Sequence, residues 1–182
     1  MKKGIWLAAA LATVMAVSGC NVTHPDTGER QAGDAGRGGA MADPKAQLRQ
    51  GMQGTGIRVE DVGDEIRLTM PGAIAFPMDA SELASQIQPA LDGVIDVLKA
   101  HPHTRVRIAG YTDATGTAAD NRRLSERRAR SVGRYLARGG IDPERLTMTG
   151  YGARHYLAGN DTPEGRAQNR RVTLTLVPTG NG

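Results

Sequence analysis

Five short segments between residues 57 and 176 alternate apolar with polar side chains. Because successive side chains of a β-strand point to opposite faces of the sheet, this alternation predicts strands with one apolar and one polar face. Gly63 and Asp64 lie between the first two segments and predict a hairpin. A sheet of such strands is covered on one face only. The apolar positions are Ile57, Val59, Ile66, Leu68, Met70, Val106, Ile108, Leu146, Met148, Val172, Leu174 and Leu176.

Two segments with helical spacing of apolar residues supply the cover. The first helix is expected within residues 83–98, and Pro89 leaves its start open. The second is expected from about Ala119 to Arg138. The elements then run hairpin, helix, strand, helix, strand, strand, which predicts an α+β fold, a two-layer sandwich. The apolar residues of the first helix are Leu83, Ile87, Leu91, Val94 and Leu98.

One arginine of the second helix falls on its apolar side. With Leu124 at zero and roughly 100° per residue, Arg128 lies near 40°, inside the apolar arc. A buried guanidinium needs a carboxylate or an anionic ligand, although a structural ion pair or snorkelling from an edge is the simpler explanation. The rest of the apolar arc is formed by Ala129, Val132, Tyr135 and Leu136. The solvated arc carries Arg123, Arg127, Arg130, Arg134 and Arg138.

Asp113 is the candidate partner of Arg128. It lies in a loop with glycines at Gly110 and Gly116, between a predicted strand and the helix that carries Arg128. A carboxylate and a guanidinium a few ångströms apart bind a zwitterion, with the carboxylate taking the ammonium and the guanidinium taking the carboxylate. An amino-acid end group has both charges. The alternative for Asp113 is to cap its own loop.

The N-terminal segment has the organisation of an export signal. Lys2 and Lys3 precede an apolar run at 5–17, which is short for a membrane span, and Cys20 is the only cysteine. Residues 17–20 resemble a lipobox, which implies acylation of Cys20 and a signal peptide of residues 1–20. A plain signal peptide or an N-terminal membrane anchor is the alternative. Asn21 follows the cysteine, and by resemblance to enterobacterial sorting it implies the outer membrane.

Residues 21–56 are rich in glycine and polar residues, a composition that does not bury enough apolar surface to fold alone. We therefore expect a tether over 21–56 and one domain over 57–178. A short helical turn is expected at 43–52, with Asp43 as its cap and Pro44 at the first helical position.

Three groups of motifs resemble the OmpA-like C-terminal domains, the family of OmpA, Pal and the MotB periplasmic domain. They are Tyr111–Gly116 with Asn121–Ala129, Gly150–Gly152, and Asn160 to Val172. The resemblance covers about residues 57–177 and implies a βαβαββ-like domain with a mixed sheet. It also implies meso-diaminopimelate of the peptidoglycan stem peptide as the ligand.

The resemblance assigns roles to individual residues. Asp113 and Arg128 match the two positions that hold the diaminopimelate zwitterion. Arg171 matches a position near the pocket, where it would meet a stem-peptide carboxylate or pair with an acid of the domain. The remaining matches at the ligand site are Thr115, Gly116, Asn121 and Leu124.

A narrower resemblance connects the chain with the YiaD-type lipoproteins, on Thr27–Arg30, Gly54–Gly56 and Met70–Gly72. Two departures stand out. Only residues 33–39 remain of the long glycine-zipper segment of that group, and Tyr156 replaces a proline.

Other function classes find little support. An enzyme would need a nucleophile or metal site, but Cys20 is committed to lipid, Ser125 lacks an S-x-x-K lysine, and His101 and His103 have no third ligand nearby. We therefore expect neither a catalyst nor a cofactor. The net charge is +4, or +2 without Lys2 and Lys3 (21 basic against 19 acidic residues), which is too weak for a nucleic-acid binder.

The expected protein is an outer-membrane lipoprotein, anchored by lipid, whose domain faces the periplasm. It would bind peptidoglycan non-covalently and support the integrity of the envelope. The arginine face of the second helix would meet water, lipid head groups or another envelope protein.

Overall fold

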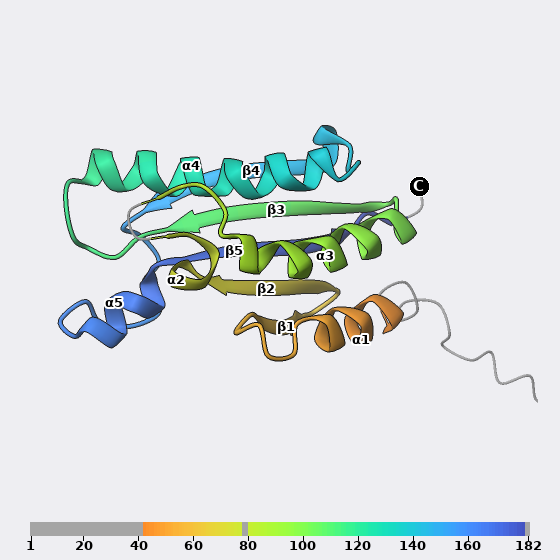
Figure 1. The fold of residues 1–182 in the computed structure, drawn as a ribbon, viewed down its shortest axis with the longest axis horizontal. Helices are drawn as coiled ribbons and strands as arrows, with labels where there is room; N and C mark the ends of the chain where they lie inside the picture. Colours follow the sequence, from red (N-terminus) through yellow and green to blue (C-terminus); the bar gives the residue numbers. More distant parts are fainter. Residues whose placement is uncertain (1–41, 78–79, 181–182) are drawn as a thin grey trace, which may run out of the picture. The chain divides into compact units, whose positions relative to one another are not determined.

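The computed structural model of the chain describes residues 42–77 and 80–180 (Figure 1). The strands are β1 (Arg58–Val62), β2 (Glu65–Pro71), β3 (Thr104–Tyr111), β4 (Leu146–Gly152) and β5 (Arg171–Pro178). The α-helices are α1 (Ala42–Gly51), α2 (Gly72–Ala75), α3 (Gln88–Ala100), α4 (Ala118–Arg138) and α5 (Pro163–Asn169). Two short 3-10 turns are η2 (Ser85–Ile87) and η3 (Pro143–Arg145).

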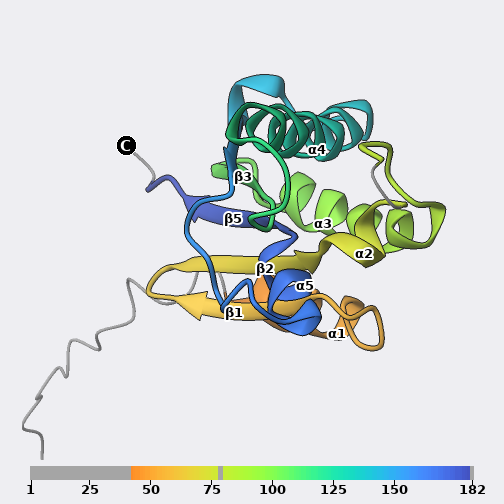
Figure 2. The same ribbon diagram turned by 90° about the vertical axis from the view of Figure 1, so that its left-hand side faces the viewer.

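The five strands form one mixed sheet in the order β1-β2-β5-β3-β4. Strands β3 and β4 are parallel, and the other neighbouring pairs are antiparallel. Figure 2 shows α1, α3 and α4 on the same side of the sheet. The opposite face has none of these helices and is called the uncovered face. The predicted α+β sandwich, with helices on one face of a mixed sheet, is confirmed.

The core lies between the helices and the sheet. Alternate residues of the strands point into it, so that Ile108 and Leu174, which are register partners, are at most 1% exposed. Met148 differs from the expectation because 37% of its surface is exposed. It lies at the edge strand β4 against Gly133 of α4, where a Cβ on Gly133 would collide with its sulfur.

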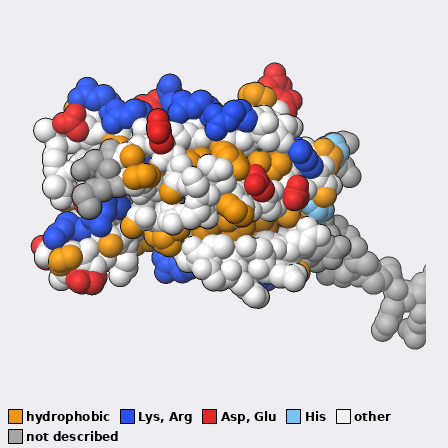
Figure 3. Space-filling model, in the orientation of Figure 1, with side chains coloured by type: hydrophobic (Ala, Val, Ile, Leu, Met, Phe, Trp, Pro, Cys, Tyr) orange, Lys and Arg blue, Asp and Glu red, His pale blue; other side chains and the backbone are white. Residues whose placement is uncertain are grey.

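Helix α4 has the orientation that the wheel predicted. Val132 and Leu136 are fully buried, and Arg128 is only 6% exposed. The five arginines of the opposite arc are exposed and form a basic ridge that is visible over α4 at the upper edge of Figure 3. The ridge consists of Arg123, Arg127, Arg130, Arg134 and Arg138.

Helices α3 and α1 add detail to the sequence expectation. Helix α3 begins at Gln88 with Pro89 in its first turn, where the missing amide hydrogen costs nothing, and η2 buries Ile87 just before it. Helix α1 falls where the helical turn was expected, but it packs on the core through Leu48 and Met52, which are 2% and 3% exposed. This part of the predicted tether therefore packs with the domain.

Helices α2 and α5 are elements that the sequence patterns did not indicate. Both are too short for a helical periodicity to be visible, with four and seven residues. The predicted signal peptide, Cys20 and residues 21–41 of the tether lie outside the described residues. Across 42–77 and 80–180, none of the helices combines the length and the apolar character that crossing a bilayer demands.

Candidate ligand-binding site

The loop of residues 112–117 joins β3 to α4 and carries Asp113. Its backbone is fastened at two points: the Thr112 amide donates to the Gly152 carbonyl at 3.0 Å, and the Ala114 amide donates to Asn160 Oδ1 at 3.1 Å. Gly116 has a φ of +88°, a conformation that only glycine adopts without strain. The loop is therefore held in one conformation by partners from distant parts of the sequence.

The start of α4 holds the other end of this loop. Thr117 caps the helix by accepting from the Asp120 amide at 3.1 Å. Asn121, which is 6% exposed, donates from Nδ2 to the Thr115 carbonyl at 2.9 Å. Asn121, Thr115 and Gly116 thus shape the loop that carries Asp113.

Helix α4 packs in close contact with the sheet next to the loop. Gly110 and Gly150 pack directly against the backbone of α4 at Ser125 and Glu126. The fully buried Ser125 hydroxyl donates to the Arg122 carbonyl and accepts from the Gly152 amide, both at 2.9 Å. Ser125 is therefore a structural tie between α4 and the end of β4.

Asp113 is 7% exposed and has two hydrogen-bond donors. Arg170 Nη1 donates to its Oδ2 at 2.6 Å, and the Thr115 amide donates to its Oδ1 at 2.9 Å. Burial raises the pKa of the Asp113 carboxyl, but these hydrogen bonds outweigh it, and the pKa lies below the usual 3.8. Asp113 is therefore a carboxylate at neutral pH.

The unfolding free energy of the domain is expected to decrease at acidic pH because of Asp113. Because its folded pKa is depressed, the carboxylate contributes stability above the unfolded pKa, and the contribution is lost as the pH falls through the folded pKa. The difference in unfolding free energy between the parent and Asp113→Asn should be constant above about pH 5 and shrink below about pH 4. Urea unfolding at a series of pH values measures it. Asp96→Asn, an exposed carboxylate of α3, is the control, and a difference that persists unchanged to about pH 2 contradicts the assignment.

Arg128 lies on the buried side of α4, one helical turn after Leu124. Its Nε donates to the Ala80 carbonyl at 3.0 Å, and its guanidinium carbon lies 5.1 Å from the centre of the Phe76 ring. The segment after α2 thus fixes the direction of the Arg128 side chain. The pairing of Arg128 with Asp113 around a shared ligand stays a prediction.

The sequence reasoning missed Arg170 and the role of Asn169. Arg170, and not Arg171, donates to Asp113. Asn169 is fully buried and accepts from the Leu157 and Ala158 amides while it donates to the Ala158 carbonyl. It also donates to Asn160 Oδ1 at 3.1 Å, the atom that holds the Ala114 amide.

Arg171 lies on the uncovered face of the sheet. It is 5% exposed, donates to the carbonyls of His155 and Asn169, and stacks on the Tyr111 ring at 3.8 Å. None of the ion pairs in the described part of the chain includes Arg171. Arg170 is the C-cap residue of α5, and β5 begins only at Arg171. The residue at which α5 ends therefore decides which arginine reaches Asp113.

The residues described here contain no group of three or more His, Cys, Asp or Glu side chains suited to hold a metal ion. The site is instead built from a buried carboxylate, a buried guanidinium and the backbone amides of the loop. These groups recognise charge, and they suit reversible binding of a ligand with both signs of charge.

The chain is similar to known proteins in both sequence and fold. The OmpA family matches residues 75–170. The chain is 37% identical to the probable lipoprotein YiaD of Escherichia coli, over 98% of this chain and 100% of that protein. It is 35% identical to the peptidoglycan-associated lipoprotein of Pseudomonas putida, over 96% of this chain and 97% of that protein. A crystal structure from Desulfovibrio vulgaris, described as MotB-like, superposes with a TM-score of 0.68 at 30% identity, over 77% of this chain and 92% of that one.

Proposed function

Because the chain belongs to the OmpA family, we propose that it is a lipoprotein that binds peptidoglycan non-covalently and connects the outer membrane to the cell wall. Its similarity over nearly the whole length to a peptidoglycan-associated lipoprotein supports the binding. The relatives are named as lipoproteins, and the proposed role needs no catalytic step.

The observation that carries the proposal is the buried, ionised Asp113 at the end of a sheet and beside α4. A carboxylate has about four acceptor positions, and Arg170 and the Thr115 amide use two of them in the structure. The ammonium of meso-diaminopimelate would take a remaining position. Arg128 would hold the carboxylate of the same end group, because a planar guanidinium binds a carboxylate with two parallel hydrogen bonds.

The other residues of the proposed site shape it. Asn121, Thr115 and Gly116 keep the loop in the conformation that presents Asp113, and Leu124 would contact the aliphatic part of the ligand. Arg170 orients the Asp113 carboxylate and balances part of its charge. Arg171 would contribute positive charge from the uncovered face of the sheet.

The anchoring part of the proposal rests on the N-terminal sequence. Acylation of Cys20 after removal of residues 1–20 would supply the two or more hydrophobic chains that stable membrane attachment requires. Residues 21–41 would then bridge the membrane and the folded domain, which would face the periplasm. Other envelope proteins would be further partners.

Co-sedimentation of the full-length protein, solubilised in detergent, with purified peptidoglycan sacculi tests the proposal. The parent is expected to pellet with the sacculi. Asp113→Asn and Arg128→Ala should each weaken binding about 100-fold, because removing one partner of a buried charge pair costs on the order of 3 kcal/mol.

Arg127→Ala is the matched control, since Arg127 precedes Arg128 on α4 but lies on the exposed basic ridge. It should bind as the parent does. Circular dichroism establishes that each variant is folded. A parent that stays in the supernatant, or folded Asp113 and Arg128 variants that pellet normally, would overturn the proposed function.

A further inference from the structure

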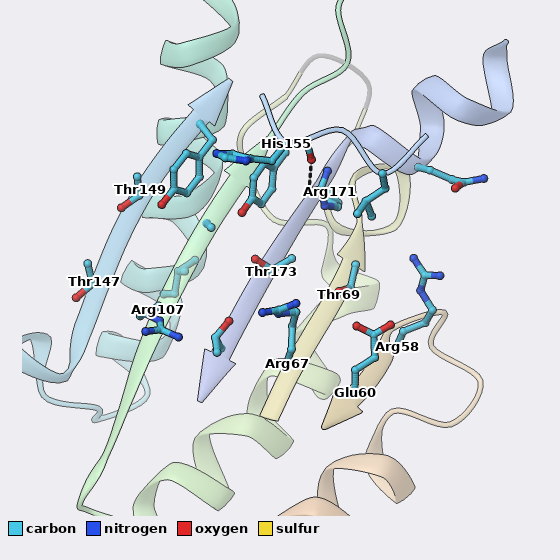
Figure 4. Close-up of a pocket in the computed structure, with 17 residues that line it drawn as sticks. Arg58, Glu60, Arg67, Thr69, Arg107, Thr147, Thr149, His155, Arg171 and Thr173 are labelled. Atoms are coloured by element: carbon cyan, nitrogen blue, oxygen red, sulfur yellow. Dashed lines mark hydrogen bonds between the residues drawn. The ribbon is translucent and has the colours of Figure 1, made fainter. Parts of the chain in front are cut away.

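The uncovered face of the sheet has a groove that shares only Arg171 with the proposed diaminopimelate site. The groove encloses about 750 Å³, a volume typical of sites for small ligands (Figure 4). Strand register places small side chains in a row across its floor: Thr69 opposite Thr173, and Thr173 opposite Ala109. These residues leave a depression between larger side chains on either side.

Arginines flank this floor. Thr175 follows Thr173 by two residues on β5, and its register partners are Arg67 of β2 and Arg107 of β3. Arg171 precedes Thr173 by two residues on the same strand. Arg58 of the edge strand β1 is the register partner of Thr69 and ends the floor row at the edge of the sheet. Figure 4 shows these four side chains around Thr69 and Thr173.

The positive charge of the groove is only partly balanced. Arg107 pairs with Glu65 at 2.6 Å, and Glu60 lies opposite Arg67 in the register. No ion pair in the described part of the chain includes Arg58 or Arg67. Like charges held close together on one face repel, and an anion placed between them would relieve that repulsion.

The charges of the groove act on one another. Burial chiefly lowers the pKa of the Arg171 guanidinium, and the charges of Arg58 and Arg67 lower it further. The three cations therefore share one electrostatic environment although they come from three strands.

Part of the groove wall comes from residues that neighbour the Asp113 site in the sequence. Tyr111 stacks with Tyr151 at 5.3 Å between ring centres, and the His155 ring meets both edge-on. His155 has a φ of +54°, a strained conformation for a residue with a side chain, and Arg171 holds its carbonyl at 2.8 Å. Tyr111 is two residues before Asp113, and Arg171 follows the arginine that donates to Asp113. Chain continuity therefore places the Tyr111 and Arg171 wall of the groove within two residues of Asp113 and one residue of Arg170.

We propose, building on the function proposed above, that this groove binds the free carboxylates of the short acidic peptide whose diaminopimelate end group occupies the Asp113–Arg128 site. Arg58 and Arg67 bind a carboxylate of that peptide, and the threonine hydroxyls of the floor bind its amide groups. The tyrosines and His155 form the wall at the junction of the two sites. The domain thus binds the acidic peptide as well as its diaminopimelate end group.

Isothermal titration of the full-length protein in detergent with three probes tests this proposal. The probes are free meso-diaminopimelate, the tripeptide L-alanyl-γ-D-glutamyl-meso-diaminopimelate, and the same tripeptide with the glutamyl α-carboxylate converted to an amide. The acidic tripeptide should bind about tenfold more tightly than the amidated one, and the ratio should fall as salt is added.

The variant Arg58→Ala/Arg67→Ala should bind both tripeptides with equal affinity and should bind free diaminopimelate as the parent does. Arg105→Ala is the matched control, because Arg105 is exposed on the uncovered face of β3 but does not line the groove. It should keep the tenfold ratio.

The outcomes separate the two proposals. If the parent binds sacculi through Asp113 and Arg128 but binds both tripeptides equally, the groove proposal is overturned and the proposed function stands. An undiminished ratio in the double variant also overturns the groove proposal. If the Asp113 and Arg128 variants bind sacculi normally, the proposed function itself fails.

Discussion

A Gly110→Ala variant is expected to lose about 3 kcal/mol or more of its unfolding free energy. The new Cβ would overlap the carbonyl oxygen and carbonyl carbon of Ser125, which belong to the backbone of α4. A backbone atom of a long helix does not move aside as the end of a flexible side chain does. The variant must therefore separate α4 from β3, which opens the core and breaks the hydrogen bond between Ser125 and Gly152.

Urea unfolding followed by circular dichroism measures this loss. Gly93→Ala is the matched control, because Gly93 lies within α3 with no atom near the position of a new Cβ. Alanine there should raise the unfolding free energy by up to about 1 kcal/mol, since glycine is a poor helix former. A Gly110 variant as stable as the parent would mean that α4 does not approach β3 as closely as described.

An Asn169→Leu variant is expected to lose about 3 kcal/mol of unfolding free energy and to weaken binding to sacculi. Leucine fills a similar volume but leaves the Leu157 and Ala158 amides and the Ala158 carbonyl without their partner. Asn160 also loses a donor, and Asn160 is the residue that holds the Ala114 amide beside Asp113. The damage therefore spreads from α5 to the ligand site.

Hydrogen exchange of the Leu157 and Ala158 amides reports this effect directly, since both should exchange much faster in the variant. Gln168→Leu changes the preceding, exposed residue and should leave both exchange and stability near parent values. Slow exchange of both amides in folded Asn169→Leu would show that Asn169 is not what holds this loop.

Local periodicity was sufficient to predict most of the fold. The alternating strands and the apolar arc of α4 follow from the geometry of single elements, and the burial of Arg128 followed from the same wheel. Helix α1 was expected as a helical turn, but its contact with the core could not be predicted from its polar mean composition, because that contact is made by Leu48 and the following Met52. Composition averages over a segment, whereas packing depends on the few side chains that reach the core.

The site was less predictable than the fold because it combines distant segments. Asp113 and its loop could be singled out from the sequence. That Arg170 donates to Asp113 depends on the residue at which α5 ends, which the sequence patterns did not indicate. The exposure of Met148 likewise depends on β4 being the edge strand, and strand order is not contained in any single segment. Long-range register is the information that local patterns lack.

The position of β5 has a consequence for how the chain acquires its structure. Among the described strands β5 comes last in the sequence, yet it lies between β2 and β3 and bonds to both of them. Until residues 171–178 are available, the β1–β2 hairpin and the β3–α4–β4 unit share no strand pairing. Such non-local pairing slows folding. The sheet therefore becomes continuous only when β5 has paired with both of its neighbours.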